Sequence, residues 1–421
     1  MFNPERETLP HEALVRRQLE GLRRTLARVD ANPAYHARLG GVTPEDIHSL
    51  DEWSGLPFLT KAELRDAYPF ELACAPREDI LRVHMSSGTT GNPILNPYTR
   101  GDIAQWAEVM ARCYCAAGVS SADVIQITPS FGLFTGGFGF HYGAEAIGAM
   151  VIPIGAGRTL LQLKLMKELG ATVLTAIATY PLRLIEVARE EGFDLGSLSL
   201  RVGILGSEMW SDELRARIER GLRIETFDLI GMTETGGPGM GMDCRDHAGI
   251  HVWEDHYYVE VIDPKTGALV PDGQEGEIVV STLTREGLPL VRYRTHDLTR
   301  VLSRERCACG RTHLRMDRFR GRTDDMLIYK GVNFYPHQVE RLLLRHPSVS
   351  HEYQIVLEAE AGERMGVLVE VEPGFDPAGG ERIRRELKDL LSLTVELTLL
   401  KPGEIPRPQG KAVRVVDKRL R

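Results

Sequence analysis

The segment Ser86-Ser-Gly-Thr-Thr-Gly91 is the part of the chain whose residue types point most directly to chemistry. Small residues let a backbone come close to a ligand, and successive N–H groups with several hydroxyls form a concave set of donors. The segment therefore predicts a polyphosphate-binding loop, with an ordinary surface turn as the alternative. It is not the common P-loop, which has a lysine directly after its second glycine, because position 92 is Asn. Its residues are Ser86, Ser87, Gly88, Thr89, Thr90 and Gly91.

A second group of residues has the composition of a metal site. Cys307 and Cys309 are two positions apart, and Cys244 and His251 lie upstream. Three sulfur ligands and one imidazole, on loops that bracket residues 244–309, suit tetrahedral zinc, and such a closed set would be structural. His247 is an alternative fourth ligand, and reduced thiols without a metal are the alternative to the whole site. A disulfide framework is not expected in a cytosolic chain.

The bulk composition indicates a soluble globular protein. The chain has 421 residues, of which 43% are hydrophobic and 26% charged, and its formal net charge is −8. That length is enough for two or three domains. Without a block of basic residues, neither nucleic acid nor a membrane surface is expected as a main partner. The start of the chain does not resemble a signal peptide, and apolar runs are too short for a membrane span, so we expect a cytoplasmic protein.

The elements after residue 123 alternate between short apolar strands and helices. Such alternation predicts a mostly parallel sheet covered by helices, which binds ligands outside the carboxyl ends of its strands. The loops at those ends, around residues 129–137, 178–181, 206–209 and 231–237, should therefore lie together. Strands are expected near 124–128, 150–154, 172–176 and 202–206, and helices near 158–170 and 181–192.

The rest of the chain supplies the flanking elements of the predicted fold. Helices are expected near 10–30, 100–117 and after an N-cap at Thr60, and a strand at 80–85 should deliver the phosphate loop. Alternating residues from 251 to 282 predict antiparallel strands. The prediction is an α/β chain with a large N-terminal domain (1–321), which includes a β-rich subdomain, and a small mobile α+β domain (322–421). Within the small domain, helices are expected at 336–346 and 380–391, and strands near 353–358, 366–371, 395–400 and 412–416.

Five spaced motifs together resemble those of the adenylate-forming enzymes, the superfamily of acyl-CoA synthetases, non-ribosomal peptide adenylation domains and luciferases. Residues 133–143 and 251–256 are similar to the phenylacetate–CoA ligase family within it, as is the compact N-terminal region. The resemblance covers the chain from about residue 80 to its end. The motifs are Ser86-Ser-Gly-Thr-Thr-Gly91, Gly231-Met-Thr-Glu234, Tyr293-Arg-Thr-His-Asp297, Gly321-Arg-Thr-Asp-Asp325 and Gly410-Lys411.

The resemblance implies an AMP-forming acid–thiol ligase. A carboxylic acid, here an aromatic one, would attack the α-phosphate of ATP and release pyrophosphate, and the thiol of coenzyme A would then displace AMP from the acyl-adenylate. The implied cofactors are ATP, Mg²⁺, coenzyme A and structural zinc, and the implied assembly is a homodimer. Transfer to a carrier-protein thiol, an amine or another nucleophile is the first alternative. A catalytically degenerate nucleotide-binding protein is the second.

The resemblance also assigns roles to single residues. Lys411 would bridge the substrate carboxylate and the α-phosphate during adenylation only, and Thr233 would hold the α-phosphate. Glu234 would hold Mg²⁺, and Asp324 would be the hinge between the domains. The nucleotide would contact the loop residues Ser86, Ser87, Gly88, Thr89, Thr90 and Gly91, together with Ser207, Glu208, Asp228, Ile230, Gly231, Met232, Asp297 and Arg322.

Two positions depart from the family pattern, and the pocket for the acid is the least defined part. The family usually has lysine where Asn92 stands and tyrosine where Ile230 stands. These departures concern the capture of phosphate and of adenine respectively. His251 is preferred over His247 as a zinc ligand because it opens a family-like run, and some relatives carry such a metal. The acid pocket is assigned to Phe131, Phe134, Gly136, Gly137, Tyr180 and Gly206.

Overall fold

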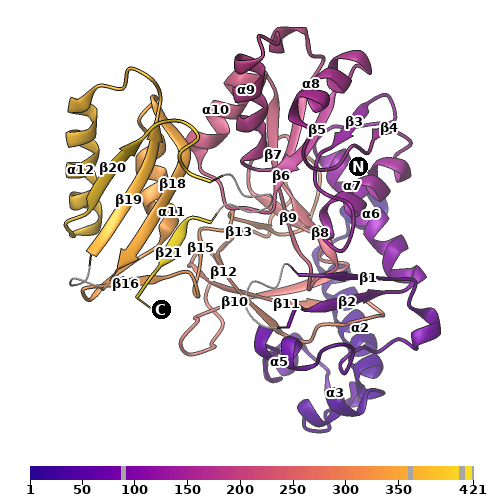
Figure 1. Ribbon diagram of the computed structural model, residues 1–421. Helices are drawn as coiled ribbons and strands as arrows, with labels where there is room; N and C mark the ends of the chain where they lie inside the picture. The colour runs from indigo at the N-terminus through magenta and orange to yellow at the C-terminus, as the bar shows by residue number, and fades with distance from the viewer. Residues whose placement is uncertain (87–91, 359–363, 407–412, 420–421) are drawn as a thin grey trace. The chain divides into compact units, whose positions relative to one another are not determined.

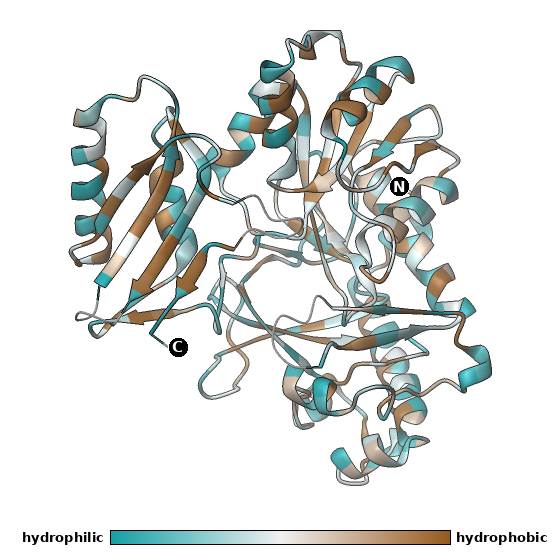
Figure 2. Ribbon diagram, viewed as in Figure 1, coloured by the Kyte–Doolittle hydropathy of each residue, from teal (hydrophilic) through white to brown (hydrophobic). Residues whose placement is uncertain are grey.

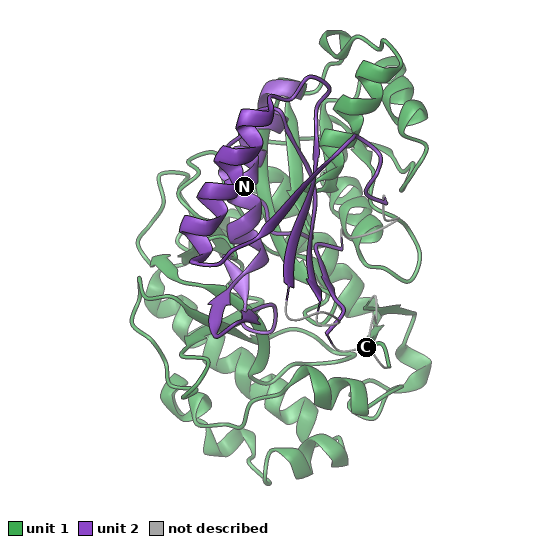
Figure 3. Ribbon diagram, turned by 60° about the vertical axis from the view of Figure 1, so that its left-hand side comes forward, with its two compact units in different colours: residues 1–207, 222–319 green, residues 208–221, 320–421 purple. Residues whose placement is uncertain are grey.

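The computed structural model describes residues 1–86, 92–358, 364–406 and 413–419. Two compact units make up the chain, one of Met1–Ser207 with Leu222–Phe319 and the other of Glu208–Gly221 with Arg320–Arg421 (Figure 3). The first holds a helix-covered sheet and a β-rich part, and the second is a small α+β unit, so the predicted fold class is confirmed. The boundary after residue 321 and the mobility of the small domain stay predictions. Most of the predicted phosphate loop, Ser87 to Gly91, and Lys411 lie outside the described residues.

A nine-stranded sheet is the centre of the first unit (Figure 1). Its order is β13-β14-β9-β8-β7-β6-β5-β3-β4, and the run from β7 to β4 is parallel. The four strands expected after residue 123 are all in that run, which confirms the parallel sheet. The strands are β3 (Val124–Ile127), β4 (Met150–Ile152), β5 (Val173–Ile177), β6 (Val202–Gly206), β7 (Glu225–Met232), β8 (Gly237–Met242), β9 (Ile250–Val252), β13 (Val301–Ser303) and β14 (Arg315–Met316).

Helices cover both faces of the parallel run. The chain passes from β3 to β4 at one edge of the sheet and then crosses back over β3 to β5, so that β3 lies between β4 and β5. Because crossovers between parallel strands are right-handed, the helix that follows β3 covers one face and the helices that follow β4 and β5 cover the other. These helices are α7 (Gly136–Ala146), α8 (Thr159–Glu168) and α9 (Tyr180–Glu190), and α6 (Arg100–Ala116) packs on α7.

Helix α7 was not predicted, because the sequence here favours a loop. Its glycines lower its helix propensity, but they allow α7 to lie unusually close to its neighbours. A Cβ atom added at Gly143 would lie 2.5 Å from the Cβ of Met110, and one at Gly139 would lie 2.7 Å from the Trp106 ring nitrogen. Gly136 and Gly137, predicted as loop residues, therefore begin a helix that packs against α6.

A hairpin and a second antiparallel sheet complete the first unit with the N-terminal helices. Strands β10, β11 and β12 pair antiparallel, as predicted. The hairpin strands β1 and β2 flank the predicted phosphate loop. The side chain of Thr60 accepts a hydrogen bond from the Glu63 backbone at 3.3 Å and caps α5, again as predicted. The elements are α1 (Pro4–Glu7), α2 (His11–Asp30), α3 (Pro33–Arg38), α4 (Leu50–Ser54), α5 (Lys61–Asp66), β1 (Arg82–Met85), β2 (Leu95–Tyr98), β10 (Tyr257–Ile262), β11 (Gly276–Thr282) and β12 (Tyr293–Thr299).

The second unit is built on a four-stranded sheet of order β20-β19-β18-β21. Buried residues of α11 and α12, such as Leu343 and Ile383, pack with it in one core. The predicted helices and strands all occur, and the short hairpin of β16 and β17 is an addition. The elements are α10 (Asp212–Leu222), β15 (Gly321–Arg322), β16 (Leu327–Tyr329), β17 (Val332–Phe334), α11 (Pro336–Leu344), β18 (Val349–Glu358), β19 (Arg364–Val371), α12 (Pro377–Leu391), β20 (Glu396–Leu400) and β21 (Val415–Asp417).

Hydrophobic residues are concentrated in the strands of both units (Figure 2). In the first unit, the parallel strands β3, β5 and β6 read as apolar runs because both of their faces are covered. Among the described residues, no helix has both the length and the apolar character that crossing a membrane requires.

Candidate active site

The hairpin of β1 and β2 closes the base of the predicted phosphate loop. The backbone N–H of Ser86 donates to the Ile94 carbonyl at 3.1 Å, and the Ser86 hydroxyl oxygen accepts from the Ile94 N–H at 3.1 Å. The Met85 N–H donates to the Leu133 carbonyl at 2.9 Å, which ties this hairpin to the loop that follows β3.

Thr233 and Glu234 lie in a buried turn directly after β7. The turn is held by the Gly236 N–H, which donates to the Thr233 carbonyl at 3.2 Å, and by the Thr235 hydroxyl, which donates to the Met232 carbonyl at 3.1 Å. Both predicted catalytic residues are buried, with 8% and 5% of their surfaces exposed. A carboxylate and a hydroxyl in adjacent positions of one rigid turn can hold a hard cation and a phosphate oxygen together.

Lys61 is a charged neighbour of this turn that the sequence reasoning missed. Its ammonium nitrogen lies 3.8 Å from Oε1 of Glu234, and its side chain is about one-third exposed. It begins helix α5 next to the cap residue Thr60. The capping signal was read correctly, but no sequence pattern connects residue 61 with residue 234, because only the tertiary fold brings α5 to the end of β7.

Asp297 is placed on β12 by an irregular stretch of backbone. His296 has a left-handed conformation with φ of 67°, and the pairing of β11 with β12 shifts between Glu277 and Val279. The Asp297 N–H donates to the Thr295 hydroxyl at 3.0 Å. A bulge of this kind re-aims a side chain, and it leaves the Asp297 carboxylate half-buried at the strand.

The other residues predicted to contact the nucleotide are on β7 or at the end of β6, and most of them are packed into the sheet. Ile230 is 5% exposed and belongs to the main hydrophobic core, and Asp228 is 6% exposed. A Cβ atom at Gly231 would lie 2.3 Å from the Gly237 carbonyl oxygen, so only glycine fits beside β8 there. Met232 is half-buried at the end of the strand. Gly206 ends β6, and Ser207 follows it with a left-handed φ of 68°.

The aromatic residues assigned to the acid pocket belong to a larger aromatic group. Phe131 meets Phe138 edge to face at a ring separation of 5.3 Å, and Phe138 stacks on Tyr142 at 6.2 Å. The buried His84 ring lies 5.5 Å from Phe138. Burial lowers the pKa of His84, which favours the neutral imidazole. Sequence reasoning missed Phe138 and Tyr142, although their spacing of four residues is a helical signal.

The remaining residues of the predicted acid pocket are spread over three elements. Phe134 is half-buried before α7, and Gly136 and Gly137 are buried in its first turn. Tyr180 begins α9, and its hydroxyl donates to the Thr159 hydroxyl at 3.3 Å. These residues follow the carboxyl ends of β3 and β5, as predicted.

Three predicted residues belong to the second compact unit. Arg322 forms a bidentate ion pair with Asp324, with Nε–Oδ1 and Nη2–Oδ2 distances of 2.8 and 2.9 Å. The predicted nucleotide contact and the predicted hinge residue are therefore partners of one another. Glu208 is the first residue of that unit's other segment.

The Cys/His residues predicted as zinc ligands come together in the first unit. The ligand atoms of Cys244, His251, Cys307 and Cys309 all lie within 4.8 Å of one another. The sulfur atoms of Cys244 and Cys307 are 3.8 Å apart, and the Cys309 sulfur is 3.5 Å from Nε2 of His251. Tetrahedral zinc with bonds of about 2.3 Å to sulfur requires sulfur atoms about 3.8 Å apart, so the donor set fits zinc.

The surroundings of the cluster favour the thiolate of Cys309 and orient the imidazole. The hydrogen bond with Cys309 raises the pKa of the Cys244 thiol, and burial raises that of Cys307. Hydrogen bonds from Cys244, His251 and Arg311 hold the pKa of the Cys309 thiol far below its usual value. Nδ1 of His251 lies 3.2 Å from the His313 carbonyl oxygen, which leaves Nε2 to face the sulfurs. His247 instead has its two nitrogens 2.7 Å from Asp243 and 3.1 Å from Glu225. The geometry therefore places His251, and not His247, in the cluster.

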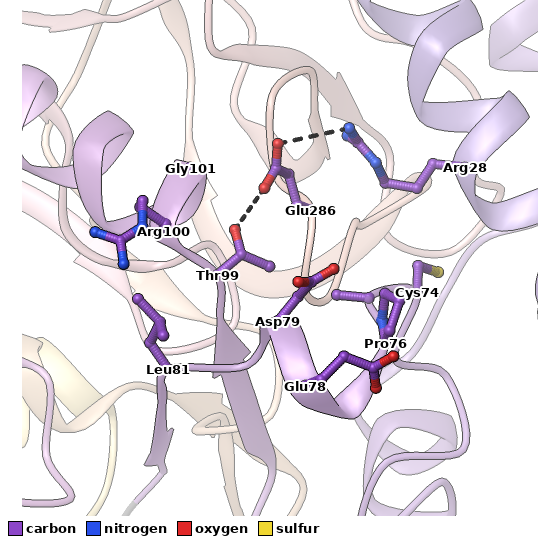
Figure 4. Close-up of a pocket in the computed structure, with 11 residues that line it drawn as sticks. Arg28, Cys74, Pro76, Glu78, Asp79, Leu81, Thr99, Arg100, Gly101 and Glu286 are labelled. Atoms are coloured by element: carbon purple, nitrogen blue, oxygen red, sulfur yellow. Dashed lines mark hydrogen bonds and ion pairs between the residues drawn. The ribbon is translucent and has the colours of Figure 1, made fainter.

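One cavity of the first unit lies apart from these groups. It has a volume of about 540 Å³ and is lined by residues of both charges, including Arg28, Glu78 and Asp79. Glu286 in its wall accepts a hydrogen bond from the Thr99 hydroxyl and lies 3.8 Å from Arg28 (Figure 4). None of the predicted site residues lines the cavity. Leu81 and Thr99, which line it, flank the β1–β2 hairpin at the end remote from Met85 and Leu95.

Comparisons with known proteins bear directly on this arrangement. The model of the AMP-binding enzyme family matches residues 22–284, and that of the AMP-binding enzyme C-terminal domain matches residues 331–419. The phenylacetate-coenzyme A ligase of Thermus thermophilus is 42% identical, with all of both chains covered. That of Escherichia coli is 39% identical, with 98% of this chain and 97% of the relative covered.

Solved structures give the same result for the fold. The chain is similar to 2-hydroxyisobutyryl-CoA ligase in its postadenylation state, with a TM-score of 0.92, 26% identity and coverage of 99% of this chain and 92% of that chain. The resemblance predicted from the five motifs is confirmed. Since a family model matches well over half of the chain and full-length relatives exceed 30% identity, the chain belongs to the phenylacetate–coenzyme A ligase family of AMP-binding enzymes.

Proposed function

We propose that the protein is an ATP-dependent, AMP-forming ligase that joins a carboxylic acid to coenzyme A. The observation that carries this proposal is the buried Thr233–Glu234 turn, which is held against the hairpin that flanks the Ser/Thr/Gly loop. Full-length relatives at about 40% identity are phenylacetate-coenzyme A ligases, which favours coenzyme A as the acceptor over a carrier protein or an amine.

The reaction has two displacement steps. In the first, a carboxylate oxygen of the acid forms a bond to the α-phosphorus of ATP, and pyrophosphate leaves with the electrons of the broken P–O bond. In the second, the sulfur of coenzyme A attacks the acyl carbon, AMP leaves, and the thiol proton goes to solvent. In the first step two anions must meet, so the site must supply positive charge and hydrogen-bond donors.

Residues of this chain divide that work between them. Glu234 would hold Mg²⁺, which when bound neutralises phosphate charge, and Thr233 would hold an α-phosphate oxygen. Asp297 would accept hydrogen bonds from the ribose hydroxyls, and Lys411 would bridge the acid and the α-phosphate. Ser86 and the five residues that follow it would bind the β- and γ-phosphates.

Lys61 supplies a positive charge that the loop at Asn92 lacks. Its ammonium, 3.8 Å from Glu234, lies beside the proposed metal ligand on a helix whose start is fixed by a capping box. A lysine there would act as a point charge toward the triphosphate. The charge that relatives place in the phosphate loop is thereby supplied from a different element.

The Cys/His cluster would hold a structural zinc ion. Three cysteines and one histidine complete a tetrahedral set and leave no open position for a substrate. The ion would join β9 to the loop that carries Cys307 and Cys309. This loop lies between β13 and β14, the two strands beyond β9 in the sheet. Homodimer formation and a cytoplasmic location stay predictions.

The acid is proposed to be aromatic, with phenylacetate as the first substrate to test. The half-buried rings of Phe131, in the loop after β3, and of Phe138, on α7, suit a flat ring. The test is ATP–pyrophosphate exchange with a panel of aromatic and aliphatic acids, followed by analysis of products with and without coenzyme A. We expect exchange with phenylacetate and a thioester only when coenzyme A is present. Silence with every acid would contradict the proposed function.

A further inference from the structure

A buried hydrogen-bond network connects the Thr233–Glu234 turn to the start of helix α6. Its central residue is Asn96 on β2, which has no exposed surface. The Asn96 amide nitrogen donates to the backbone carbonyl of Thr233 and, at 3.4 Å, to that of Glu234. Because Asn96 is on β2, the same amide also belongs to the hairpin that flanks the Ser/Thr/Gly loop.

Arg285 fixes the orientation of that amide. Its Nη2 donates to the Asn96 side-chain oxygen at 2.6 Å and to the Pro97 carbonyl at 3.1 Å. A guanidinium can only donate and a carbonyl oxygen can only accept, so turning the Asn96 amide over would break its bonds to Arg285 and to the two carbonyls of the turn. Hydrogen bonds from a charged donor are strong, and they polarise the amide toward the turn.

The network ends in a carboxylate with its own set of partners. Asp102, 3.4 Å from Nη1 of Arg285, accepts hydrogen bonds from the backbone N–H groups of Thr99, Glu286 and Gly287 at 2.8 to 3.0 Å. The Arg285 guanidinium also lies over the ring of Tyr98 at 4.4 Å. Asn96, Arg285 and Asp102 are each at most 1% exposed. Their charges are balanced, and each side chain has little freedom to move.

We propose that Asn96 and Arg285 are positioning residues for the adenylation step. They hold the Thr233–Glu234 backbone at a fixed place relative to strand β2, and so position the proposed Mg²⁺ ligand. This inference rests on the proposed roles of Thr233 and Glu234. Preorganisation of this kind matters because small displacements of catalytic groups lower rates steeply.

The test compares Asn96→Asp and Arg285→Lys with wild type in ATP–pyrophosphate exchange with phenylacetate at a series of Mg²⁺ concentrations. Asn96→Asp keeps a partner for Arg285 but removes both donors to the turn. We expect kcat to fall by about ten- to a hundredfold and the Mg²⁺ concentration for half-maximal rate to rise by about tenfold. Arg285→Lys should likewise lower kcat and raise the Mg²⁺ concentration for half-maximal rate. The KM for phenylacetate should change little in both variants.

Arg112→Lys is a matched control for loss of a buried guanidinium. Arg112 is also fully buried, pairs bidentately with Asp255 at 2.7 and 2.9 Å, and bonds to Glu108 rather than to the turn. We expect it to lower the melting temperature without changing the Mg²⁺ requirement. If Asn96→Asp and Arg285→Lys behave like this control, the network serves only stability and the proposal is overturned.

A second measurement keeps this test separate from that of the proposed function. The rise in melting temperature on adding MgATP needs no acid and no turnover. We expect MgATP to raise the melting temperature of wild type and to raise that of Arg285→Lys by less. Arg285→Lys is the milder variant, so it tests the positioning role even if Asn96→Asp does not fold. Equal MgATP responses in wild type and Arg285→Lys would overturn the positioning role. Absence of exchange in wild type with all acids would overturn the proposed function instead.

Discussion

At the scale of single residues, we propose that a tertiary neighbour, Lys61, supplies the positive charge that position 92 lacks. The loop at 86–91 is followed by Asn92, and Lys61, which lies on another element, has its ammonium 3.8 Å from the proposed Mg²⁺ ligand Glu234. An ammonium next to a buried carboxylate is less screened than one on an open surface, so its charge acts more strongly. The position of Lys61 is therefore expected to matter for ATP rather than for the acid.

Replacing Lys61 tests this expectation. We expect Lys61→Met to raise the KM for ATP by about tenfold in pyrophosphate exchange, because one charge near the triphosphate is lost. Lys61→Arg should retain part of the affinity. Lys164→Met is the matched control, since Lys164 also lies 3.8 Å from a carboxylate, that of Glu168, but with 64% of its side chain exposed. An unchanged KM for ATP in Lys61→Met would rule out its role.

At the scale of elements, short strands and loops far apart in sequence are held together at the Cys/His cluster. Arg315 of β14 pairs with His251 of β9, so this strand pair sets the histidine beside the cysteine loop. Helix α1 adds the buried Glu7, whose carboxylate lies 2.7 Å from Nε of Arg311, and Arg311 in turn donates to the Cys309 sulfur at 3.6 Å. These elements are short and meet at the cluster, so a metal bound there would join them and add to their stability.

Metal analysis tests the element-scale proposal. We expect about one zinc per chain, and its loss in Cys307→Ser/Cys309→Ser, with a melting temperature lower by roughly 5 °C or more. Cleavage by protease within residues 244–314 should become faster. Cys115→Ser, a half-buried cysteine outside the cluster, is the control that should keep the metal. Metal-free wild-type protein, or a double variant with full zinc and unchanged melting, would contradict the proposal.

At the scale of the whole molecule, the two steps of the reaction draw on different parts of the chain. Thr233, Glu234 and Asp297 belong to the first compact unit, whereas Lys411 follows β20 in the sequence of the second. The resemblance of Gly410-Lys411 to the motif of adenylate-forming enzymes implies a role for this lysine in adenylation only. Loss of Lys411 should therefore affect one step and not the other.

Separate assays of the two steps test this division. We expect Lys411→Ala to lower acyl-adenylate formation by about a thousandfold or more, since it removes the charge that offsets two anions. Thioester formation from supplied acyl-adenylate and coenzyme A should remain within a few-fold of wild type. Lys401→Ala, at an exposed lysine of the same unit, is the control. Normal pyrophosphate exchange in Lys411→Ala would contradict the mechanism.

Much of the architecture follows from local sequence signals. Hydrophobic runs of period two or 3.6, the Thr60 cap and the alternation after residue 123 predicted α2, α6 and the parallel strands, since these depend on neighbours in sequence. Helix α7 was missed because its helical state depends on close contact with α6, which overrides the low propensity of its glycines. Strand β8 was missed because four of its six residues are glycine or proline, which have low strand propensity.

The sequence by itself determined the family, the reaction class and the residue types of the site, because spaced motifs carry that information along the chain. The cysteines and His251 were likewise predicted as a set from their chemistry. Only the tertiary structure brought Lys61 beside Glu234, separated His247 from the cysteines, and set Asn96 and Arg285 behind the Thr233–Glu234 turn. The contacts of Asn96 with the turn and with Arg285 join residues 137 to 189 positions apart in the sequence. A buried polar side chain selects its partner by position in space, since each donor or acceptor removed from water must find one.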